Sequence, residues 1–344
     1  MAVEPRTGQV YIGSDQSRAL LTIDGRTGRF QGSTALAGPP VALSMDARRG
    51  RLLVLSLGFA THDIVLSVVA AGSAQLLSSI HLDPQPGTAV GYSGGAVAVV
   101  ESTGRAVVTS MDTNEVYFLD VRTGTVLHTV TVGRLPQPPD AVAVDGQVEH
   151  VVIIVDRART ATLLDARTGA VLRTVTVGVS PQAVAVDERT HRAFVVNEGP
   201  RGRDGLPVGT GSVSVLDMRS GAVLRTIGVG VAPHAVALDA RTGRVFVVNE
   251  GIQDARGMIT TRGSVSVLDA QTGIVLRTVA LGLQPIAVAV DDRIGRAFIV
   301  DHGGRLIRDT WSWLPAWLRR SLPFSGQPQI VVVPGSVDVI DATQ

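Results

Sequence analysis

The sequence predicts an all-β repeat protein, and three observations support this. Aspartates 187, 239 and 291 occupy one position of a repeated unit, 52 residues apart each time. Short runs of Val, Ile, Thr and Phe, which strands favour, fill each unit. Turns of the form Asp-x-x-Thr-Gly separate the runs, and the chain has 38 glycines to supply such turns. A fixed period of this size indicates copies of one supersecondary unit.

Each unit contains four strand-like segments. In the sixth copy they are AVAL at 235–238, RVFVVN at 244–249, SVSVLD at 264–269 and IVLRTVALG at 274–282. In each turn, Asp accepts hydrogen bonds from the backbone ahead of it and Gly adopts the positive φ that closes the hairpin. The strands are apolar on both faces, so we expect each sheet to be sandwiched between two neighbouring sheets.

Seven copies of the unit span the chain. Their first strands begin near residues 2, 41, 96, 141, 183, 235 and 287. Four-stranded units repeated seven times predict a seven-bladed β-propeller of antiparallel blades, formed as a single domain over 1–344. A linear β-solenoid is the alternative, but its repeats are shorter and lack the four-strand hairpin pattern.

The last unit is irregular in two ways. An insertion at 303–334 separates its second and third strands, and the sequence ends at its third strand, SVDVIDATQ at 336–344. The N-terminus supplies only Ala2 and Val3 as the end of a first strand. We therefore expect a ring that closes incompletely, or one in which the N-terminal segment pairs with the last blade.

Composition excludes several classes of function. The 31 basic and 30 acidic residues nearly cancel, which argues against a nucleic-acid-binding protein. Without cysteine, the chain has no disulfide, zinc-thiolate site or cysteine nucleophile. No apolar run approaches the ~20 residues of a membrane-spanning helix. The first residues read as a strand end and not as a signal peptide, so we expect a cytoplasmic protein or the mature form of an exported one.

The units resemble the YVTN-type β-propeller repeat, which occurs in many bacterial and archaeal extracytoplasmic proteins. FVVNEG at 194–199 and 246–251, SVSVLD at 212–217 and 264–269, and three G-x-x-P-x-A-V-A-[VL]-D joints from 178, 230 and 282 carry the resemblance. Phe replaces the family's Tyr and Val replaces its Thr, and the match weakens before residue 95. The resemblance implies an extracytoplasmic propeller, periplasmic or at the cell surface. It specifies no function, because the repeat serves binding proteins, surface proteins and relatives of quinoprotein dehydrogenases.

The insertion holds every tryptophan of the chain. Such aromatic and basic composition is typical of interfacial elements, so 310–324 is a candidate contact for a partner or a membrane surface. A lid over the channel mouth and a segment packed back onto the propeller are the alternatives. The candidate contact residues are Trp311, Trp313, Trp317, Arg319 and Arg320.

A second candidate site lies at the mouth of the central channel. Residues after each inter-blade Pro and residues that end the second strands are expected to surround it, where they would bind a small polar ligand or form an ordinary solvated rim. The seven histidines show no H-x-H or H-x-x-x-H spacing, so we assign neither a metal site nor a cofactor. The candidate ligand-binding residues are Asp140, Gln182, His234, Asn197, Asn249, Asp301 and His302.

Two classes of function fit these observations. No G-x-S-x-G, P-loop or strand-linked G-x-G-x-x-G motif is present, so we assign no catalytic residue. The sequence favours a monomeric, non-enzymatic binding scaffold that uses the loop-elaborated face of blades 5–7 to bind a protein, surface or small-molecule partner. The alternative is a quinoprotein-dehydrogenase-like or lactonase-like enzyme with its site at the channel mouth.

Overall fold

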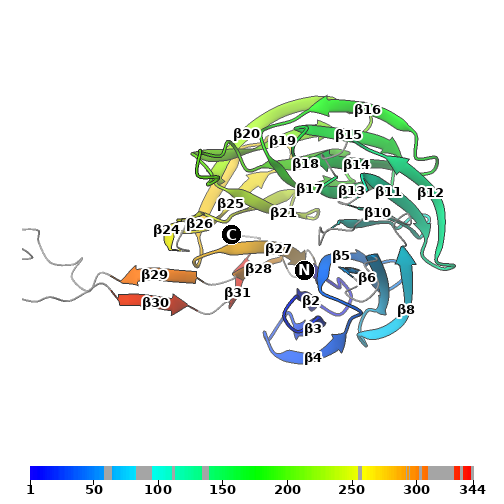
Figure 1. Cartoon of the computed structure of the whole chain (residues 1–344), viewed down its shortest axis with the longest axis horizontal. Helices are drawn as coiled ribbons and strands as arrows, with labels where there is room; N and C mark the ends of the chain where they lie inside the picture. Colours follow the sequence, from blue (N-terminus) through cyan, green and yellow to red (C-terminus); the bar gives the residue numbers. More distant parts are fainter. Residues whose placement is uncertain are drawn as a thin grey trace, which may run out of the picture.

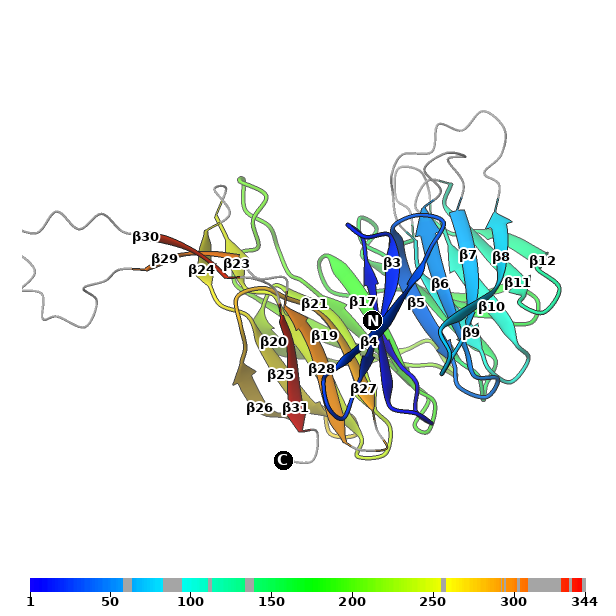
Figure 2. The same cartoon turned by 90° about the horizontal axis from the view of Figure 1, so that it is seen from below.

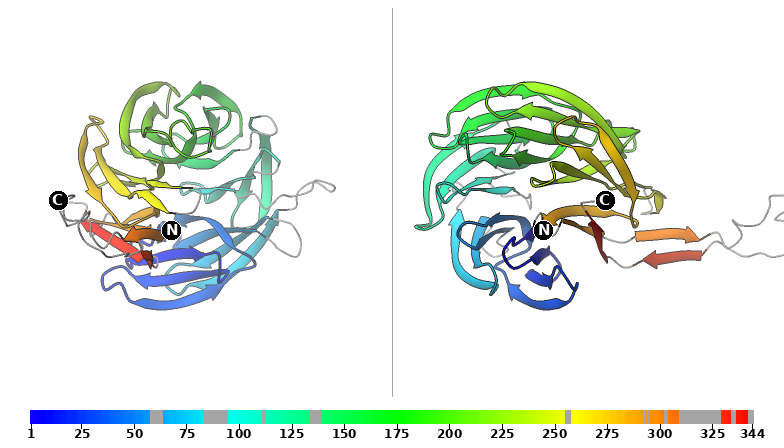
Figure 3. Two further views of the ribbon diagram at one scale, coloured as in Figure 1. Left: turned by 60° about the vertical axis from the view of Figure 1, so that its left-hand side comes forward. Right: turned by 180° about the vertical axis from the view of Figure 1, so that it is seen from behind.

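The computed structural model shows seven antiparallel sheets that follow one another around a ring (Figures 1 and 3). It describes residues 1–57, 64–82, 95–110, 113–133, 139–254, 258–291, 293, 295–301, 304–308, 329–333 and 336–341. These residues form strands and turns but no helix. The prediction of an all-β, seven-bladed propeller is confirmed. In the part of the chain that is described, no helix has the length and apolar character needed to span a bilayer.

The first four blades each contain four strands in sequence order from the axis outward. Blade 1 holds β1 (Ala2–Val3), β2 (Gln9–Ser14), β3 (Ala19–Asp24) and β4 (Phe30–Ala35). Blade 2 holds β5 (Pro40–Asp46), β6 (Arg51–Leu57), β7 (Ile64–Ala70) and β8 (Gln75–Leu82). Blade 3 holds β9 (Val97–Val100), β10 (Arg105–Thr109), β11 (Glu115–Asp120) and β12 (Thr125–Thr131). Blade 4 holds β13 (Ala141–Asp145), β14 (His150–Val155), β15 (Thr160–Asp165) and β16 (Val171–Thr176).

The last three blades carry the elaborations. Blade 5 holds β17 (Pro181–Asp187), β18 (Arg192–Asn197), β19 (Thr210–Asp217) and β20 (Val223–Val231). Blade 6 holds β21 (Pro233–Asp239), β22 (Arg244–Asn249), β25 (Ser264–Asp269) and β26 (Val275–Ala280), with the hairpin β23 (Ile252–Gln253) and β24 (Ile259–Thr261) between its second and third strands. Blade 7 holds β27 (Pro285–Asp291), β28 (Arg296–Asp301) and β31 (Ser336–Asp341). A hairpin of β29 (Gly304–Arg308) and β30 (Gln329–Val333) interrupts it and extends away from the ring (Figure 1).

Blade 7 therefore contains three strands among the described residues, in the order β27-β28-β31. Blade 7 is the exception to the four-stranded rule that the other six sheets follow. The arms β29 and β30 belong to the insertion, whereas Trp311, Trp313, Trp317, Arg319 and Arg320 lie outside the described residues.

The core lies between adjacent blades, as predicted from strands that are apolar on both faces. The phenylalanine at the third residue of the second strand in blades 5, 6 and 7 shows how adjacent blades pack. Phe194 of β18 packs against Val245 and Val247 of blade 6. Phe246, its equivalent in β22, packs against blade 7, and Phe298 in β28 packs against blade 1. Blades 5, 6 and 7 thus each bury a phenylalanine ring against the next blade, and this burial holds these sheets face to face.

Among the residues that the structure describes, blades 7 and 1 meet by packing and share no strand. The N-terminal segment pairs within blade 1, where Ala2 lies opposite Tyr11 and Val3 opposite Val10. Of the two modes of closure considered above, pairing of this segment with the last blade is therefore not observed. At the seam between blades 7 and 1, Phe298 packs against Val3 and Val10. The Arg293 guanidinium donates to the Arg6 carbonyl at 2.8 Å. This hydrogen bond links the first turn of blade 7 to the first turn of blade 1.

Candidate functional site

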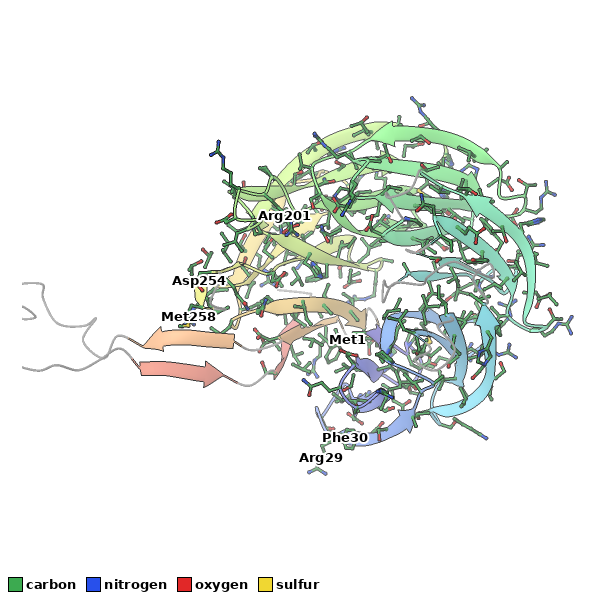
Figure 4. The ribbon with its side chains drawn as sticks, viewed as in Figure 1. Met1, Arg29, Phe30, Arg201, Asp254 and Met258 are labelled. Carbon is green, nitrogen blue, oxygen red and sulfur yellow. The ribbon has the colours of Figure 1, made fainter. Side chains whose placement is uncertain are left out.

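The elaborated connections of blades 5 and 6 lie on one side of the molecule. The β23–β24 and β29–β30 hairpins project on the same side of the ring (Figure 2). Arg201, from the β18–β19 connection, and Asp254, from the tip of the β23–β24 hairpin, lie on neighbouring loops there (Figure 4). The opposite side carries the short Asp-x-x-Thr-Gly turns. Binding residues on a rigid scaffold concentrate in elaborated loops, so the elaborated face is the candidate site.

A small polar pocket of about 170 Å³ lies between these connections. Blade 5, blade 6 and the joint between blades 6 and 7 all contribute to it. Its polar residues are two carboxylates, two amides and one guanidinium, and apolar Leu206 and Pro207 form part of the wall. The lining residues are Glu198, Arg201, Leu206, Pro207, Glu250, Gly251, Gln253 and Gln284.

Glu198 is held on the blade 5 side of the pocket by three donors. Its Oε2 accepts hydrogen bonds from Ser180 Oγ at 3.2 Å, Gln182 Nε2 at 3.2 Å and Arg201 Nη2 at 2.7 Å. The backbone of Glu198 is fixed as well, since its N–H donates to the Ser180 carbonyl at 2.8 Å. The carboxylate is nearly buried and the guanidinium is half exposed. The ion pair therefore fixes the geometry of this wall and leaves part of the Arg201 side chain open to solvent.

Glu250, the equivalent residue of blade 6, is held differently. Its Oε1 accepts a hydrogen bond from Gln284 Nε2 at 2.6 Å, and Gln284 Oε1 accepts one from Gln253 Nε2. The Glu250 N–H donates to the Ala232 carbonyl at 2.9 Å, which repeats the backbone contact of Glu198. An amide thus contacts Glu250 where a guanidinium contacts Glu198. With two carboxylates and one cation, the pocket carries a net negative charge.

Sequence reasoning identified only part of this cluster. The candidate residues predicted above include Gln182 but not Glu198, Glu250, Gln253 or Gln284. The recurrence of Glu after the last residue of the second strand, at 198 and 250, is the signal that marks the site. Nothing in the local pattern of Gln284 separates it from other residues before an inter-blade Pro.

The predicted channel-mouth residues Asn197 and Asn249 are buried within their blades. Asn197 Nδ2 donates to Ser214 Oγ at 3.1 Å, and Asn249 Nδ2 donates to Ser266 Oγ at 3.0 Å. A Cβ on Gly230 would lie 2.5 Å from the Asn249 Cγ, so glycine is required at the joint for close approach. The structure therefore directs the Nδ2 groups of both amides to serines of their own blades.

Asp301 occupies the corresponding position of blade 7 and is also buried. It accepts from the Gln284 N–H at 3.3 Å, which links this position to the pocket. Gln182 contributes directly through its bond to Glu198, whereas His234 is exposed on β21. His302 lies outside the described residues.

Asp140 contacts a different part of the molecule from the residues around the polar pocket. Its Oδ2 accepts the Asp156 N–H at 2.6 Å, which ties the approach to β13 to the β14–β15 turn. Burial raises the pKa of the Asp140 carboxyl to about 6. Among the residues that the structure describes, no group of three or more His, Asp or Glu side chains is placed to hold a metal ion.

Comparison with known proteins supports the fold and goes no further. No family model matches the sequence, and no curated protein matches it. Among solved structures, a chain titled hydrazine synthase, from Kuenenia stuttgartiensis, is similar with a TM-score of 0.65 and 15% sequence identity. The match covers 87% of this chain and 90% of that chain. Together with the blade topology, it defines a seven-bladed β-propeller.

Proposed function

We propose that this propeller is a non-enzymatic binding module whose elaborated face, formed by blades 5–7, engages a partner or small ligand. The observation that carries the proposal is the pocket between Glu198 and Glu250. Its polar side chains are already oriented by hydrogen bonds, so a ligand would bind with little further ordering. This face also carries the longest connections of the described chain.

The chemistry of the pocket favours a cationic group as the ligand. The two carboxylates exceed the single guanidinium by one negative charge, and the amides of Gln253 and Gln284 offer further hydrogen bonds. A guanidinium or ammonium group, as on a basic side chain of a partner, complements this set. The volume of about 170 Å³ admits such a head group but no large cofactor.

A titration with agmatine, which carries a guanidinium and an ammonium group, tests the proposal. We expect saturable binding by calorimetry at low salt, with a loss of about tenfold in Glu250→Gln, because one charge-assisted hydrogen bond is removed. Asp15→Asn is the matched control, since Asp15 is an exposed carboxylate outside the pocket. Binding that is absent, or that weakens equally in both variants, would contradict a cation site here.

We further propose that 310–324 extends the docking surface and that the protein acts outside the cytoplasm. Two observations support the first point. All three tryptophans lie in this segment, and the described arms β29 and β30 lead away from the ring (Figure 1). Because the sequence has no tryptophan outside this segment, intrinsic tryptophan fluorescence reports on this segment alone. We expect the emission to shift to the blue on addition of anionic liposomes. Emission that lipid leaves unchanged argues against membrane docking.

The alternative is a quinoprotein-dehydrogenase-like or lactonase-like enzyme with its site at the channel mouth. One observation favours it, because a carboxyl such as Asp140, with a pKa of about 6, is suited to proton transfer near neutral pH. The enzyme hypothesis requires that Asp140→Asn and His234→Ala abolish a turnover detected with the wild-type protein. If both variants retain it, the site is not at the channel mouth.

A further inference from the structure

The polar pocket between blades 5 and 6 has two walls that differ in how their carboxylates are paired. On the blade 5 wall, the Glu198 carboxylate accepts three hydrogen bonds, one of them from the Arg201 guanidinium. On the blade 6 wall, Glu250 Oε1 accepts a hydrogen bond from the Gln284 amide, and within the described ranges its Oε2 has no hydrogen-bond partner. The charge of Glu198 is therefore compensated within its own wall, whereas the charge of Glu250 is left for a ligand.

The Arg201 guanidinium is held in place and still has N–H groups to offer. Its Nη2 donates to Glu198 Oε2 at 2.7 Å, and its Nη1 donates to the Gly205 carbonyl at 3.1 Å. A guanidinium carries more N–H donors than these two bonds use, and the Arg201 side chain is 52% exposed. Arg201 can therefore bind a second carboxylate, from a ligand, without releasing Glu198.

The amides of the blade 6 wall are oriented by a short relay of hydrogen bonds. Gln253 Nε2 donates to Gln284 Oε1, and Gln284 Nε2 donates to Glu250 Oε1 at 2.6 Å. Because both amide nitrogens donate along this relay, it leaves Gln253 Oε1 and Glu250 Oε2 as acceptors on residues that line the pocket. An ammonium group, which carries N–H donors and no acceptor, matches such a pair.

An apolar surface and a small volume limit what the pocket can hold. Leu206 and Pro207 line it and belong to the same connection as Arg201. The Gly202 N–H donates to the Leu206 carbonyl at 2.8 Å and the Leu206 N–H donates to Asp204 Oδ1 at 3.1 Å, so this connection is folded by its own hydrogen bonds. The volume of about 170 Å³ is below the ~300–1,000 Å³ of sites for drug-sized molecules. A ligand with a short methylene chain, packed against this apolar surface, therefore fits.

We propose that the pocket binds a small amino acid, whose ammonium group pairs with Glu250 and Gln253 and whose carboxylate pairs with Arg201. The inference rests on the proposed function, because it assigns a ligand class to the same pocket, and the cationic group expected there is the ammonium of the amino acid. A ligand with cationic groups alone leaves the remaining N–H groups of Arg201 unmatched and meets its positive charge. A ligand with a carboxylate alone leaves Glu250 unpaired. A molecule that carries both charges satisfies both walls.

Calorimetric titration of the full chain at low salt with glycine, β-alanine and 4-aminobutyrate tests the proposal. We expect saturable binding, with the tightest ligand being the one whose charge separation best matches the distance between the two walls. The matched comparison is the carboxamide of each ligand, which keeps the ammonium group and the chain length but has no carboxylate. We expect the carboxamide to bind about tenfold more weakly, because it loses a charge-assisted hydrogen bond to Arg201. Carboxamides that bind as tightly as the amino acids would overturn the proposal.

Arg201→Gln provides an independent test, because it should change the binding of two ligands in opposite directions. The amino acid loses its anion partner and should bind about tenfold more weakly, whereas agmatine no longer meets a positive charge and should bind more tightly. Glu250→Gln should weaken the binding of both ligands. Arg203→Gln, at an exposed arginine of the same connection that does not line the pocket, is the matched control and should change neither. An equal loss of both ligands in Arg201→Gln would show that Arg201 only supports the loop, and would overturn the proposal.

The same titrations separate this inference from the proposed function. Binding of agmatine without binding of any of the amino acids would overturn the amino-acid site and leave the cation site standing. If neither class of ligand binds, both proposals fail. Binding of an amino acid that weakens in Arg201→Gln, while binding of agmatine strengthens, supports both.

Discussion

At the residue scale, Asp140 shows how burial couples protonation to stability. Its pKa is raised to about 6 by desolvation, whereas an aspartate in an unfolded chain titrates near 3.9. The folded protein therefore binds this proton more tightly than the unfolded chain does. For this group alone, stability is greatest below about pH 4 and falls as pH rises to about 6.

Asp140→Asn isolates this contribution. Its carbonyl oxygen can still accept the Asp156 N–H, so the turn contact is retained. We expect the variant to melt at a higher temperature than wild type at pH 7.5 and at the same temperature at pH 4. Thermal unfolding monitored by circular dichroism measures this. A difference that does not change with pH would show that the carboxyl is not titrating in this range.

His191 tests a second residue-scale effect, because it combines a left-handed backbone with a buried contact. Its φ is +54°, at a position where blade 6 has Gly243. Its Nδ1 lies 2.8 Å from Asp145 Oδ2 of blade 4. We expect His191→Ala to cost about 2 kcal/mol, because Asp145 Oδ2 loses its His191 contact, and His191→Gly to cost about 1 kcal/mol less by relieving the backbone. Urea denaturation compares the two, and equal costs would rule out strain at this residue.

At the element scale, a turn of the form Asp-x-x-Thr-Gly, with Ser in place of Thr in blade 5, forms the outer hairpin of five blades. In blade 5, Asp217 Oδ1 accepts the N–H groups of Arg219 and Ser220 at 3.1 and 2.7 Å. Although desolvation opposes it, these bonds keep the pKa of Asp217 below its usual value, as they do for Asp24, Asp120, Asp165 and Asp269. This stabilisation is present above about pH 4 and is lost as pH falls through the lowered pKa.

Asp217→Ala measures what one turn contributes. We expect a loss of about 1 kcal/mol at pH 7, because two backbone donors lose their acceptor. Asp217→Asn keeps the acceptor oxygen and removes the charge, so it should lose less. The difference between wild type and Asp217→Ala should shrink below pH 3. A difference that stays constant down to pH 2 would show that the carboxylate form is not what stabilises the turn.

These turns also explain how much of the molecule the sequence predicts. Blade count, strand order and hairpin turns rest on local patterns that recur along the chain, 52 residues apart in the last three units, and the structure confirms them. The polar pocket was missed because it joins Glu250, Gln253 and Gln284, whose contact depends on how two loops fold together. The role of Asn197 and Asn249 depends on side-chain direction at a strand end. A repeat pattern fixes neither loop packing nor that direction.

At the scale of the whole molecule, the seam between blades 7 and 1 is the one junction that chain connectivity does not enforce. Phe298, Val3 and Val10 hold it through packing, and arginine contacts to carbonyls of blade 1 reinforce it. Every other pair of neighbouring blades is joined by a covalent connection. Local opening of the ring should therefore start at this seam.

Phe298→Ala tests this expectation against Phe246→Ala, its equivalent at the junction of blades 6 and 7. Both truncations remove a buried ring and should cost about 3–5 kcal/mol. Only Phe298→Ala should selectively accelerate amide exchange in β2 and β28, read by mass spectrometry. Similar exchange patterns in the two variants would mean that the ring opens without preference for the seam.

Closure by packing has a consequence for how such a chain changes over generations. Among the described residues, the strands of each blade follow one another in the sequence, and β1 pairs within blade 1. Duplication or loss of a gene segment one repeat long therefore adds or removes a complete sheet and leaves every remaining strand with its partners. The near-identical units at 181–230 and 233–282 are what such copying produces. Recombination can therefore change the number of blades in this architecture. The limit is the angle between neighbouring blades, which must still allow the first and last blades to meet.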